Sequence, residues 1–242
     1  MKTMIFPDHA AMSRYAAQMI ADQVRANPAS VLGLATGSTP EQTYEELVKI
    51  HREENLSFAQ VTTFNLDEYW GLAGSHPASY RYYMQERLFN YIDIPLEQTH
   101  IPRGDVVDAA AECARYEELL ATHGPVDLQI LGIGTNAHIG FNEPGTEFGS
   151  TTHLVDLTQD TIEANSRFFS SPDDVPKQAI SMGIKSIMQA RQIVLMASGS
   201  SKADAVAKSI QGPVTPEVPA SVLQLHPNCI FLLDEAAAAG LK

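Results

Sequence analysis

The sequence is poor in cysteine and contains no long apolar run. Cys113 and Cys229 are its only cysteines, and both lie in segments with helix or strand patterns, so we expect buried free thiols rather than a disulfide or metal site. No run of about 18 apolar residues is present, which argues against a membrane-spanning helix. The first residues, interrupted by Pro7 and Asp8, lack the apolar stretch of a secretory signal. These absences favour the cytoplasm.

Basic residues are also scarce. The chain has 16 Lys and Arg residues against 29 Asp and Glu residues, for a formal net charge of −13. Because nucleic-acid binding needs a basic surface and no basic cluster is present, we expect no nucleic-acid partner. The overall charge also repels anions at long range. Any anion site must therefore be built locally, from a few basic groups and backbone N–H donors.

Apolar segments alternate with amphipathic ones along the chain. Buried strands are expected at 31–35, 61–66, 126–134, 192–198 and 229–234. Helices are expected at 10–24, 40–52, 109–121, 180–189 and 202–210. For the second helix, Thr39 is a plausible N-cap and Pro40 a plausible first residue.

Strands that are apolar throughout, separated by helices, predict an α/β fold. We expect a Rossmann-like, doubly wound, mainly parallel sheet with helices on both faces, and residues 1–242 are treated as a single domain. In such sheets ligands bind beyond the carboxyl ends of the strands. The strand ends are therefore the segments to search for chemistry.

Two strand ends carry groups suited to an anion. Thr36, Gly37, Ser38 and Thr39 lead from a strand into a helix, where a tight glycine turn, N–H groups and hydroxyls can hold a phosphate. Lys202 follows a later strand at a helix start, where a cation is unfavourable unless it serves an anion. The alternatives are an ordinary capped helix start and a solvated lysine.

Two other strand ends carry groups suited to proton transfer. Asp67 is a candidate general base, because burial raises a carboxyl pKa; the alternative is a turn or capping residue. The segment 131–145, LGIGTNAHIGFNEPG, is predicted to be a loop that displays polar groups. In this loop His138 can transfer protons near neutral pH, with Asn136 or Glu143 to orient it.

Other motifs are incomplete. GIGTNA (132–137) fits the GxGxxA dinucleotide pattern, but such a fingerprint must open a helix and the following HIGFNEPG is not helical in pattern. The GxSxG elbow of serine hydrolases and the HExxH zinc motif are absent. We therefore expect no nucleotide cofactor and no metal.

The chain resembles the glucosamine-6-phosphate deaminase (isomerising) family, in its short-chain form, nearly end to end. The resemblance is carried by LGLATGSTPEQTYEELVKIH, VTTFNLDEYWGL, LGIGTNAHIGFNEPG, ANSRFF, VPKQAISMGIKSIM, GSSKA and LQLHP. The related phosphogluconolactonases share the fold and GxGxxxH, whereas FNEPG is similar to the deaminases. The resemblance implies conversion of D-glucosamine 6-phosphate and water to D-fructose 6-phosphate and ammonia, without a cofactor, in amino-sugar catabolism.

The resemblance also implies roles for individual residues. Asp67 would take the C2 proton and deliver it toward C1, and His138 would serve ring opening, flanked by Glu143 and Asn136. The implied substrate-binding residues are Thr36, Gly37, Ser38, Thr39, Tyr80, Arg167 and Lys202. The segment around 148–180, which contains Ser, Asp and Pro, is a candidate lid.

Some positions depart from the family pattern. Asn136 stands where some relatives carry Asp, and can orient His138 without adding charge. Ala137 stands where Gly is usual, which asks for an ordinary backbone conformation or a small local shift. Longer relatives have a regulatory site for the N-acetylated sugar phosphate. Its basic residues align with His153 and Val155, and the C-terminal extension is missing, so we expect no such activation and a monomer or small homo-oligomer.

Two alternative functions remain. A lactonase or another sugar-phosphate isomerase would share the fold, although Asp67 and Glu143 both stand in a deaminase context. A sugar-phosphate-sensing regulator would need a DNA-binding segment. Residues 1–30 are too few for a helix-turn-helix with a linker and are not basic.

Overall fold

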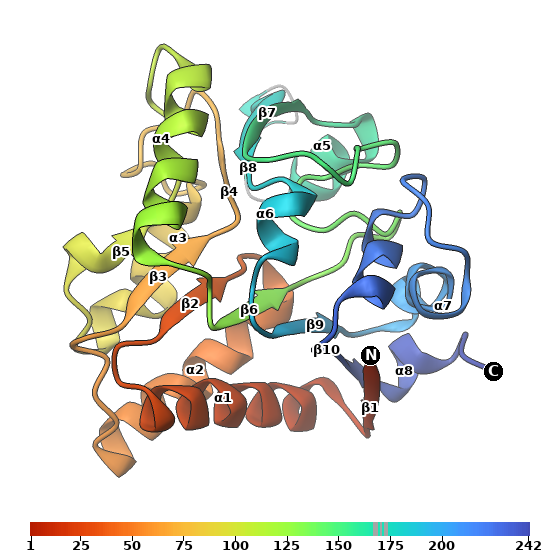
Figure 1. Cartoon of the computed structure of the whole chain (residues 1–242), viewed down its shortest axis with the longest axis horizontal. Coiled ribbons are helices and arrows are strands. Elements are labelled where there is room, and N and C mark those ends of the chain that lie inside the picture. Colours follow the sequence, from red (N-terminus) through yellow and green to blue (C-terminus); the bar gives the residue numbers. More distant parts are fainter. Residues whose placement is uncertain (167–168, 170, 172–173) are drawn as a thin grey trace.

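The centre of the molecule is a seven-stranded sheet. A computed structural model describes residues 1–166, 169, 171 and 174–242, and Figure 1 shows their arrangement. The strand order is β1-β10-β9-β6-β2-β3-β5, and every neighbouring pair runs parallel. The strands are β1 (Lys2–Phe6), β2 (Val31–Leu34), β3 (Thr62–Asn65), β5 (Thr99–His100), β6 (Leu128–Leu131), β9 (Ile193–Ala197) and β10 (Cys229–Asp234). The predicted mainly parallel sheet is confirmed.

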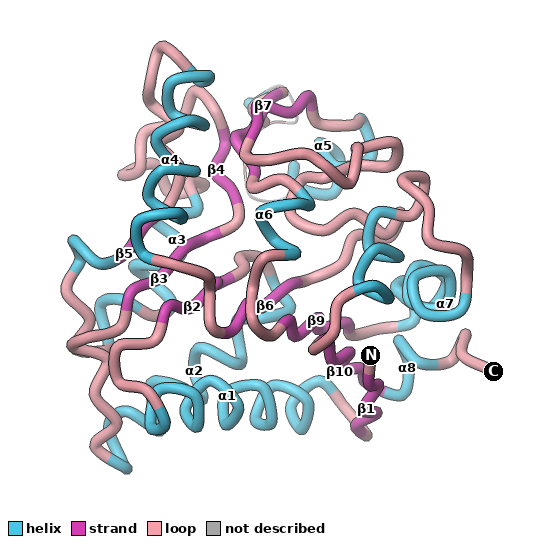
Figure 2. The backbone as a smooth tube through the Cα atoms, viewed as in Figure 1, coloured by secondary structure: helices cyan, strands magenta, loops and turns pink. Residues whose placement is uncertain are grey.

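Helices cover both faces of this sheet, as Figures 1 and 2 show. On one side lie α1 (His9–Ala26) and α2 (Ser38–Glu54), and on the other lie α4 (Ala109–His123) and α6 (Ile184–Met188). The remaining helices are α3 (Tyr80–Arg87), α5 (Gln159–Asn165), α7 (Ala203–Gln211) and α8 (Glu235–Ala238). The expected Rossmann-like α/β fold is therefore observed.

Local sequence explains how α1 forms and packs. Asp8 is its N-cap, and the carboxylate accepts a hydrogen bond of 2.7 Å from the Ala11 N–H, satisfying a donor that the first turn would otherwise leave unpaired. Met12, Ala16 and Ile20 recur every four residues and are fully buried or nearly so. This spacing places them on one helix face, where they pack into the core.

A second, smaller sheet was not predicted. It contains β4 (Asp67–Tyr69), β8 (Gln178–Ser181) and β7 (His153–Asp156) in that order, and both pairs are antiparallel. The helix predicted at 180–189 is therefore wrong at its start, because Ile180 belongs to β8. The helical pattern is interrupted at Gly183, where an added Cβ would lie 2.2 Å from the Ser150 carbonyl oxygen. The helix α6 begins at the next residue.

The start of α2 also differs from the expectation. Gly37, not Thr39, is the N-cap, and its φ of 98° turns the chain directly from β2 into the helix. Pro40 consequently is the third helical residue rather than the first. It is tolerated there because N–H groups of the first turn have no intrahelical acceptor.

The strand order reverses between β2 and β6. From β2 the chain proceeds outward to β3 and β5, and it then returns to the other side of β2 to form β6, β9 and β10. Such a reversal leaves a crevice beyond the carboxyl ends of the two central strands, which is where ligands bind in open α/β sheets. Topology alone therefore places a site at the ends of β2 and β6.

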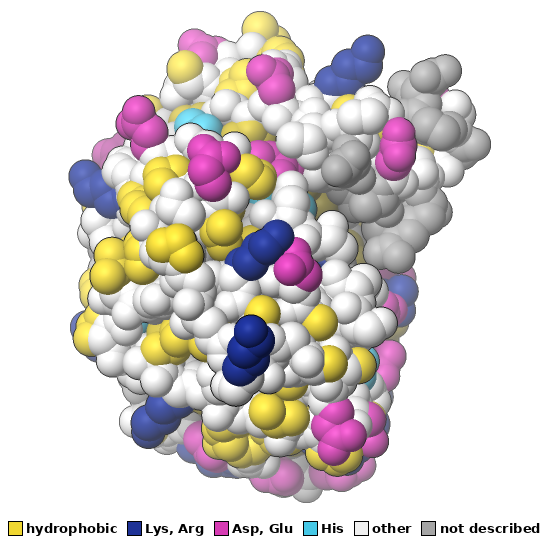
Figure 3. All heavy atoms as spheres, turned by 90° about the vertical axis from the view of Figure 1, so that its right-hand side faces the viewer, with side chains coloured by type: hydrophobic (Ala, Val, Ile, Leu, Met, Phe, Trp, Pro, Cys, Tyr) yellow, Lys and Arg dark blue, Asp and Glu magenta, His cyan; other side chains and the backbone are white. Residues whose placement is uncertain are grey.

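Three further expectations from composition concern the cysteines, membrane-spanning helices and basic surface patches. Cys113 in α4 and Cys229 in β10 are buried free thiols, as predicted, and burial raises their pKa to about 11 and about 12. Among the described helices, none combines the length and apolar character needed to cross a membrane. On the face shown in Figure 3, Lys and Arg side chains of the described residues are scattered rather than gathered into a basic patch.

Candidate active site

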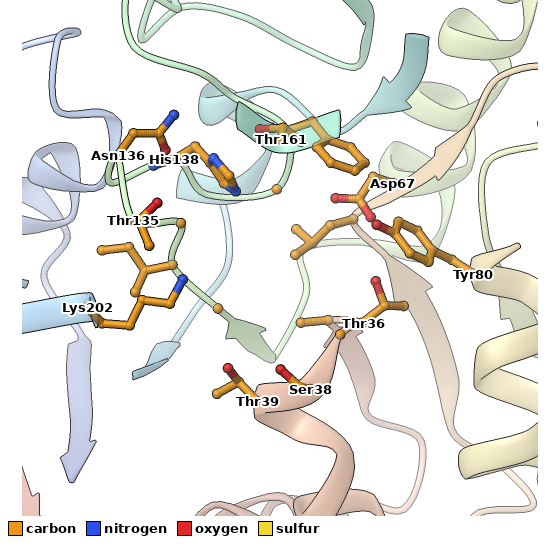
Figure 4. A pocket seen from close by; sticks show the side chains of 18 residues that line it. Thr36, Ser38, Thr39, Asp67, Tyr80, Thr135, Asn136, His138, Thr161 and Lys202 are labelled. Atoms are coloured by element: carbon orange, nitrogen blue, oxygen red, sulfur yellow. Dashed lines mark hydrogen bonds between the residues drawn. The ribbon is translucent and has the colours of Figure 1, made fainter. Parts of the chain in front are cut away.

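A cavity of about 240 Å³ lies at the crevice between β2 and β6. Its walls come from the loops that follow β2, β3, β6 and β9, as Figure 4 shows. The predicted site residues that line it are Thr36, Gly37, Ser38, Thr39, Asp67, Tyr80, Asn136, His138 and Lys202. Glu143 lies beside His138 rather than on the cavity wall, and Arg167 lies outside the described residues.

One end of the cavity is suited to an anion. The first turn of α2 borders it with Ser38 and Thr39, so the positive end of the helix dipole and two hydroxyls are available there. Lys202, the residue before α7, contributes a cation from the loop after β9 (Figure 4). These groups are suited to the kind of local anion site that was expected of a chain of charge −13.

Both loops at this end are held from behind. The Tyr83 hydroxyl donates to the Gly37 carbonyl at 2.7 Å, and the His9 Nε2 lies 2.8 Å from the Thr39 carbonyl oxygen. On the Lys202 side, the Asp234 carboxylate accepts from the Ser198 hydroxyl and from the Gly199 N–H at 3.0 Å. The anion end is therefore a preformed arrangement rather than two loose loops.

Asp67 occupies the opposite wall and has an unusual environment. Its exposed fraction is 7%, and no hydrogen-bond donor to its carboxylate is found among the described residues. Burial, and then the charge of Glu68, raise its pKa to about 8. This agrees with the raised pKa expected for a general base, because a base works best when its pKa lies near the operating pH.

Tyr80 lies beside Asp67 on the same wall (Figure 4). Its ring stacks on Phe141 at an interplanar angle of 17°, and its hydroxyl is 3.4 Å from that of Tyr69. Burial, followed by neighbouring Tyr69 and Asp67, raises the Tyr80 pKa well above the usual value. The hydroxyl therefore stays protonated and can donate a hydrogen bond next to Asp67.

His138 forms a pair with Glu143. The His138 Nδ1 and a Glu143 carboxylate oxygen are 3.4 Å apart. Burial alone would raise the pKa of Glu143, but His138, Thr161 and Asn136 together lower it to about 2. Glu143 is thus ionised at neutral pH and places a negative charge beside the imidazole.

Asn136 contacts both members of this pair by hydrogen bonds. Its amide group donates to Glu143 at 2.6 Å, and its carbonyl oxygen accepts from the backbone N–H of His138 at 3.2 Å. Neither contact is to the imidazole ring. The ability of Asn136 to orient His138 therefore operates through the backbone and through Glu143.

Two further contacts to Glu143 were missed in the sequence. The hydroxyls of Thr161 and Thr158 donate to its other carboxylate oxygen at 2.6 and 3.3 Å. Thr158 is the N-cap of α5, and a threonine before a helix is a recognisable signal. No local pattern distinguishes Thr161, because its partner is 18 residues away in the chain.

The structure corrects the expectation that the backbone of Ala137 is ordinary. Its φ is 68°, so it adopts the left-handed conformation rather than an ordinary one. For a residue with a side chain this conformation costs about 1–2 kcal/mol. Its carbonyl oxygen accepts from the Ala220 N–H at 3.0 Å, a contact that helps to hold the strained turn beside His138.

The backbone of Gly134 lies close to the imidazole ring of His138. This close approach leads to the first prediction. An added Cβ would lie 2.4 Å from the His138 ring, although the backbone of Gly134 is not left-handed. We expect Gly134→Ala to displace the ring and lower kcat/KM about tenfold, since small misplacements at a reacting centre are costly. Steady-state kinetics and thermal melting would measure this.

The matched control is Gly149→Ala, where an added Cβ meets nothing within 4 Å and the φ is also ordinary. Equal activity of the two variants, or a Gly134→Ala loss explained by unfolding, would contradict the proposed contact.

Metal and nucleotide sites were not expected. In the described part of the chain, no group of three or more His, Cys, Asp or Glu side chains is arranged to hold a metal ion. The GIGTNA segment leads into turns and an isolated bridge between Ile139 and Asn142, not into a helix. It therefore lacks the helix N-terminus on which a dinucleotide fingerprint depends.

The fold and site together define a class of protein. It has an open α/β fold with a cavity at the topological switch point, lined by groups suited to bind an anion and by two titratable side chains, Asp67 and His138. Comparison with known proteins identifies the family within that class. The family model described as glucosamine-6-phosphate isomerases/6-phosphogluconolactonase matches residues 8–231, and the chain belongs to this family.

Individual relatives are similar over their whole length. A glucosamine-6-phosphate deaminase of Rhodopirellula baltica is 55% identical over 97% of this chain and 94% of its own. That of Clostridioides difficile is 52% identical over 100% of this chain and 97% of its own. A solved structure of a monomeric glucosamine-6-phosphate deaminase has a TM-score of 0.98 at 48% identity, covering 99% of this chain and 100% of its own.

The lactonase branch is similar in fold. A 6-phosphogluconolactonase from Leishmania guyanensis has a TM-score of 0.79 at 21% identity, covering 100% of this chain and 98% of its own. At this level of identity, the likeness extends to the architecture alone.

Proposed function

We propose that this chain is a glucosamine-6-phosphate deaminase, which converts D-glucosamine 6-phosphate and water to D-fructose 6-phosphate and ammonia. The observation that carries the proposal is one cavity that combines the buried carboxyl of Asp67, a His–Glu pair and a set of groups suited to an anion. The full-length relatives named for this activity support it.

Binding begins at the anion end. The 6-phosphate is held by the Thr36–Thr39 loop and Lys202, with Arg167 proposed as a further ligand from outside the described residues. A phosphate at this end leaves the other end of the sugar against Asp67 and His138. Binding energy from the phosphate thereby positions the reacting carbons.

Ring opening is assigned to His138. Opening the pyranose requires a proton to leave the C1 hydroxyl and another to reach the ring oxygen, which suits an imidazole. Glu143, held by Asn136 and Thr161, stabilises the positive charge that His138 carries when it binds a proton. The product of this step is the open-chain aldehyde.

Isomerisation is assigned to Asp67. It removes the C2 proton while the C1 carbonyl oxygen takes up a proton, giving an enolamine across C1 and C2. It then returns a proton to C1 on the same face, and loss of a proton from the nitrogen leaves a C2 imine. Water adds to the imine carbon, and ammonia leaves as the C2 carbonyl forms. The Tyr80 hydroxyl, beside Asp67, is placed to donate a hydrogen bond near these carbons.

The raised pKa of Asp67 gives the second prediction. Only ionised Asp67 can accept a proton, so kcat/KM is expected to rise with pH and to level off above about 8. The pH dependence of kcat/KM measures this. A limb near pH 4, where an ordinary aspartate titrates, would show that Asp67 is not the buried base described here.

The function is tested by measuring ammonia release from glucosamine 6-phosphate beside hydrolysis of 6-phosphogluconolactone. We expect the first reaction to proceed without added metal or nucleotide, and to exceed the second. Absence of ammonia at millimolar substrate, with rapid lactone hydrolysis, would instead place the chain with the lactonases.

The segment 148–180 is proposed as a lid over the site. It contains β7, α5 and β8, and the hydroxyls of Thr158 and Thr161 reach from it to Glu143. The ring of Phe169 also packs against Tyr69, with centroids 5.7 Å apart. Closure of this segment would exclude water while the enolamine exists.

We further propose a cytoplasmic enzyme of one domain that acts as a monomer or small homo-oligomer. The buried free thiols and the similarity to a monomeric deaminase support this.

The regulatory positions give the third prediction. His153 and Val155 on β7 do not provide the basic pair of longer relatives. N-acetylglucosamine 6-phosphate is therefore expected to leave the substrate saturation curve hyperbolic and its midpoint unchanged. A lower midpoint on addition of this compound would reveal a regulatory site that these residues do not account for.

A further inference from the structure

Glu68, the residue after Asp67, is buried on the opposite side of β4. Side chains alternate along a strand, so Asp67 faces the active-site cavity while Glu68 faces away from it. Only Asp67 of the two lines that cavity, and Glu68 instead borders a separate one with Arg81 and Arg103. With an exposed fraction of 1%, Glu68 is among the most buried carboxyl groups of the described chain.

The Glu68 carboxylate holds the start of α3. One oxygen accepts from the N–H groups of Tyr69 and Tyr80 at 2.9 and 3.0 Å, and the other accepts from the N–H of Arg81 at 3.0 Å. Tyr80 and Arg81 are the first two residues of the helix, whose N–H groups have no intrahelical acceptor. Glu68 thereby joins the helix that carries Tyr80 to the strand that carries Asp67.

Among the described residues, no basic side chain forms an ion pair with Glu68. The nearby Arg81 guanidinium instead donates to the hydroxyl and carbonyl of Thr99 at 2.7 and 2.9 Å. A buried carboxylate that is balanced mainly by N–H dipoles acts strongly on a neighbouring charge.

We propose that Glu68 is a positioning residue for the deaminase reaction, which holds Tyr80 beside Asp67 and keeps a buried negative charge next to Asp67. The inference rests on the proposed function of the Asp67 site. It assigns to the second acid of the AspGlu pair a task that is distinct from proton transfer.

The charges around Asp67 are consistent with this assignment. Tyr80 from α3 and Tyr116 from α4 face it, and burial raises the pKa of both, so both are neutral near pH 7. His138 and Lys202 line the cavity across from it. Glu68 supplies the adjacent negative charge, which adds to burial in raising the pKa of Asp67. Burial raises the pKa of Glu68 above its usual value, and three backbone N–H groups and the Ser79 hydroxyl reduce this rise.

Glu68→Gln tests the charge. The amide keeps the size of the side chain and removes the negative charge, so the limb of kcat/KM assigned to Asp67 is expected to move about one pH unit lower, with KM changed less than threefold. The matched control is Glu86→Gln, which lies at an exposed position on α3. It should leave the limb in place. A residue that merely stabilised the fold would lower activity without moving this limb.

Glu68→Asp tests the position. The charge remains but the side chain is one methylene shorter and reaches the α3 N–H groups less well. We expect kcat to fall about tenfold while the limb stays at the wild-type pH. This variant also keeps the inference testable if Glu68→Gln fails to fold, which thermal melting would reveal.

The outcomes separate this inference from the proposed function. A wild-type protein that releases no ammonia would refute the function itself. An active wild type, with a Glu68→Gln limb that superimposes on it or a Glu68→Asp variant with unchanged kcat, would overturn the role of Glu68 alone.

Discussion

Replacing Asp67 by Asn is expected to lower kcat about 10²–10⁴-fold, the range of a lost general base, and to abolish exchange of the C2 hydrogen with solvent. The amide keeps the size of the side chain but cannot accept the proton at neutral pH. Because the anion end of the cavity is formed by other residues, inhibition by inorganic phosphate should be unchanged. Exchange is measured by NMR in deuterium oxide, and retained exchange would remove Asp67 from its role.

The same substitution is expected to stabilise the fold. Folding raises the pKa of Asp67 from 3.8 to about 8, so stability is lost as the pH rises from below 4 through 8 and the carboxyl must ionise while buried. Asn removes this penalty, and the variant should gain about 1–3 kcal/mol above pH 7, since one pKa unit corresponds to about 1.4 kcal/mol. Thermal melts at pH 5 and pH 8.5 would show a larger gain at the higher pH.

Replacing Lys202 by Met is expected to lower kcat/KM about 100-fold, mainly through a higher KM. Met keeps an unbranched side chain and removes the cation, and a charge-assisted hydrogen bond contributes about 1.5–3 kcal/mol. Some loss in kcat is also expected, because phosphate binding positions the reacting carbons. The measurement is steady-state kinetics together with the inhibition constant of inorganic phosphate.

Lys208→Met is the matched control for this change. Lys208 lies on α7, the helix that Lys202 precedes, and pairs with Asp204 at 2.7 Å on the surface. It should leave both constants unchanged. Equal effects of the two substitutions would mean that Lys202 acts through general surface charge rather than as a phosphate ligand.

The architecture could be predicted from the sequence because its central strands are mainly apolar. β6 and β9 are buried along their whole length. β9 is therefore an uninterrupted apolar run, and β6 is interrupted only by the buried Gln129, as expected for strands covered on both faces. The small sheet was missed because β4 has only three residues and follows β3 after a single residue, so nothing in the sequence separates the two strands. Ile180, Ile184 and Ile187 are spaced as on a helix, and only the contact at Gly183 breaks the pattern.

Site residues could be predicted where they directly follow a predicted strand. Asp67, His138 and Lys202 each follow a predicted strand, and the reversal of strand order brings their loops to one cavity. The contacts of Thr161 and Glu68 could not be predicted, because they depend on how α5 and α3 pack against distant segments. The left-handed conformation of Ala137 also has no local signal, since its residue type disfavours it.

The stretch 131–145 thus has a narrower role than its glycines suggest. It supplies the His138–Glu143 pair and the strained turn at Ala137, while the carbon-acid step is proposed for Asp67 on β4. The proposed mechanism therefore uses a single carboxyl that acts on one face of the enolamine.

The most direct test follows the hydrogen at C1 by NMR while glucosamine 6-phosphate is converted in deuterium oxide. We expect ammonia and D-fructose 6-phosphate in equal amounts, with deuterium entering only one of the two C1 positions. Equal labelling of both C1 positions, or the absence of D-fructose 6-phosphate, would contradict the account.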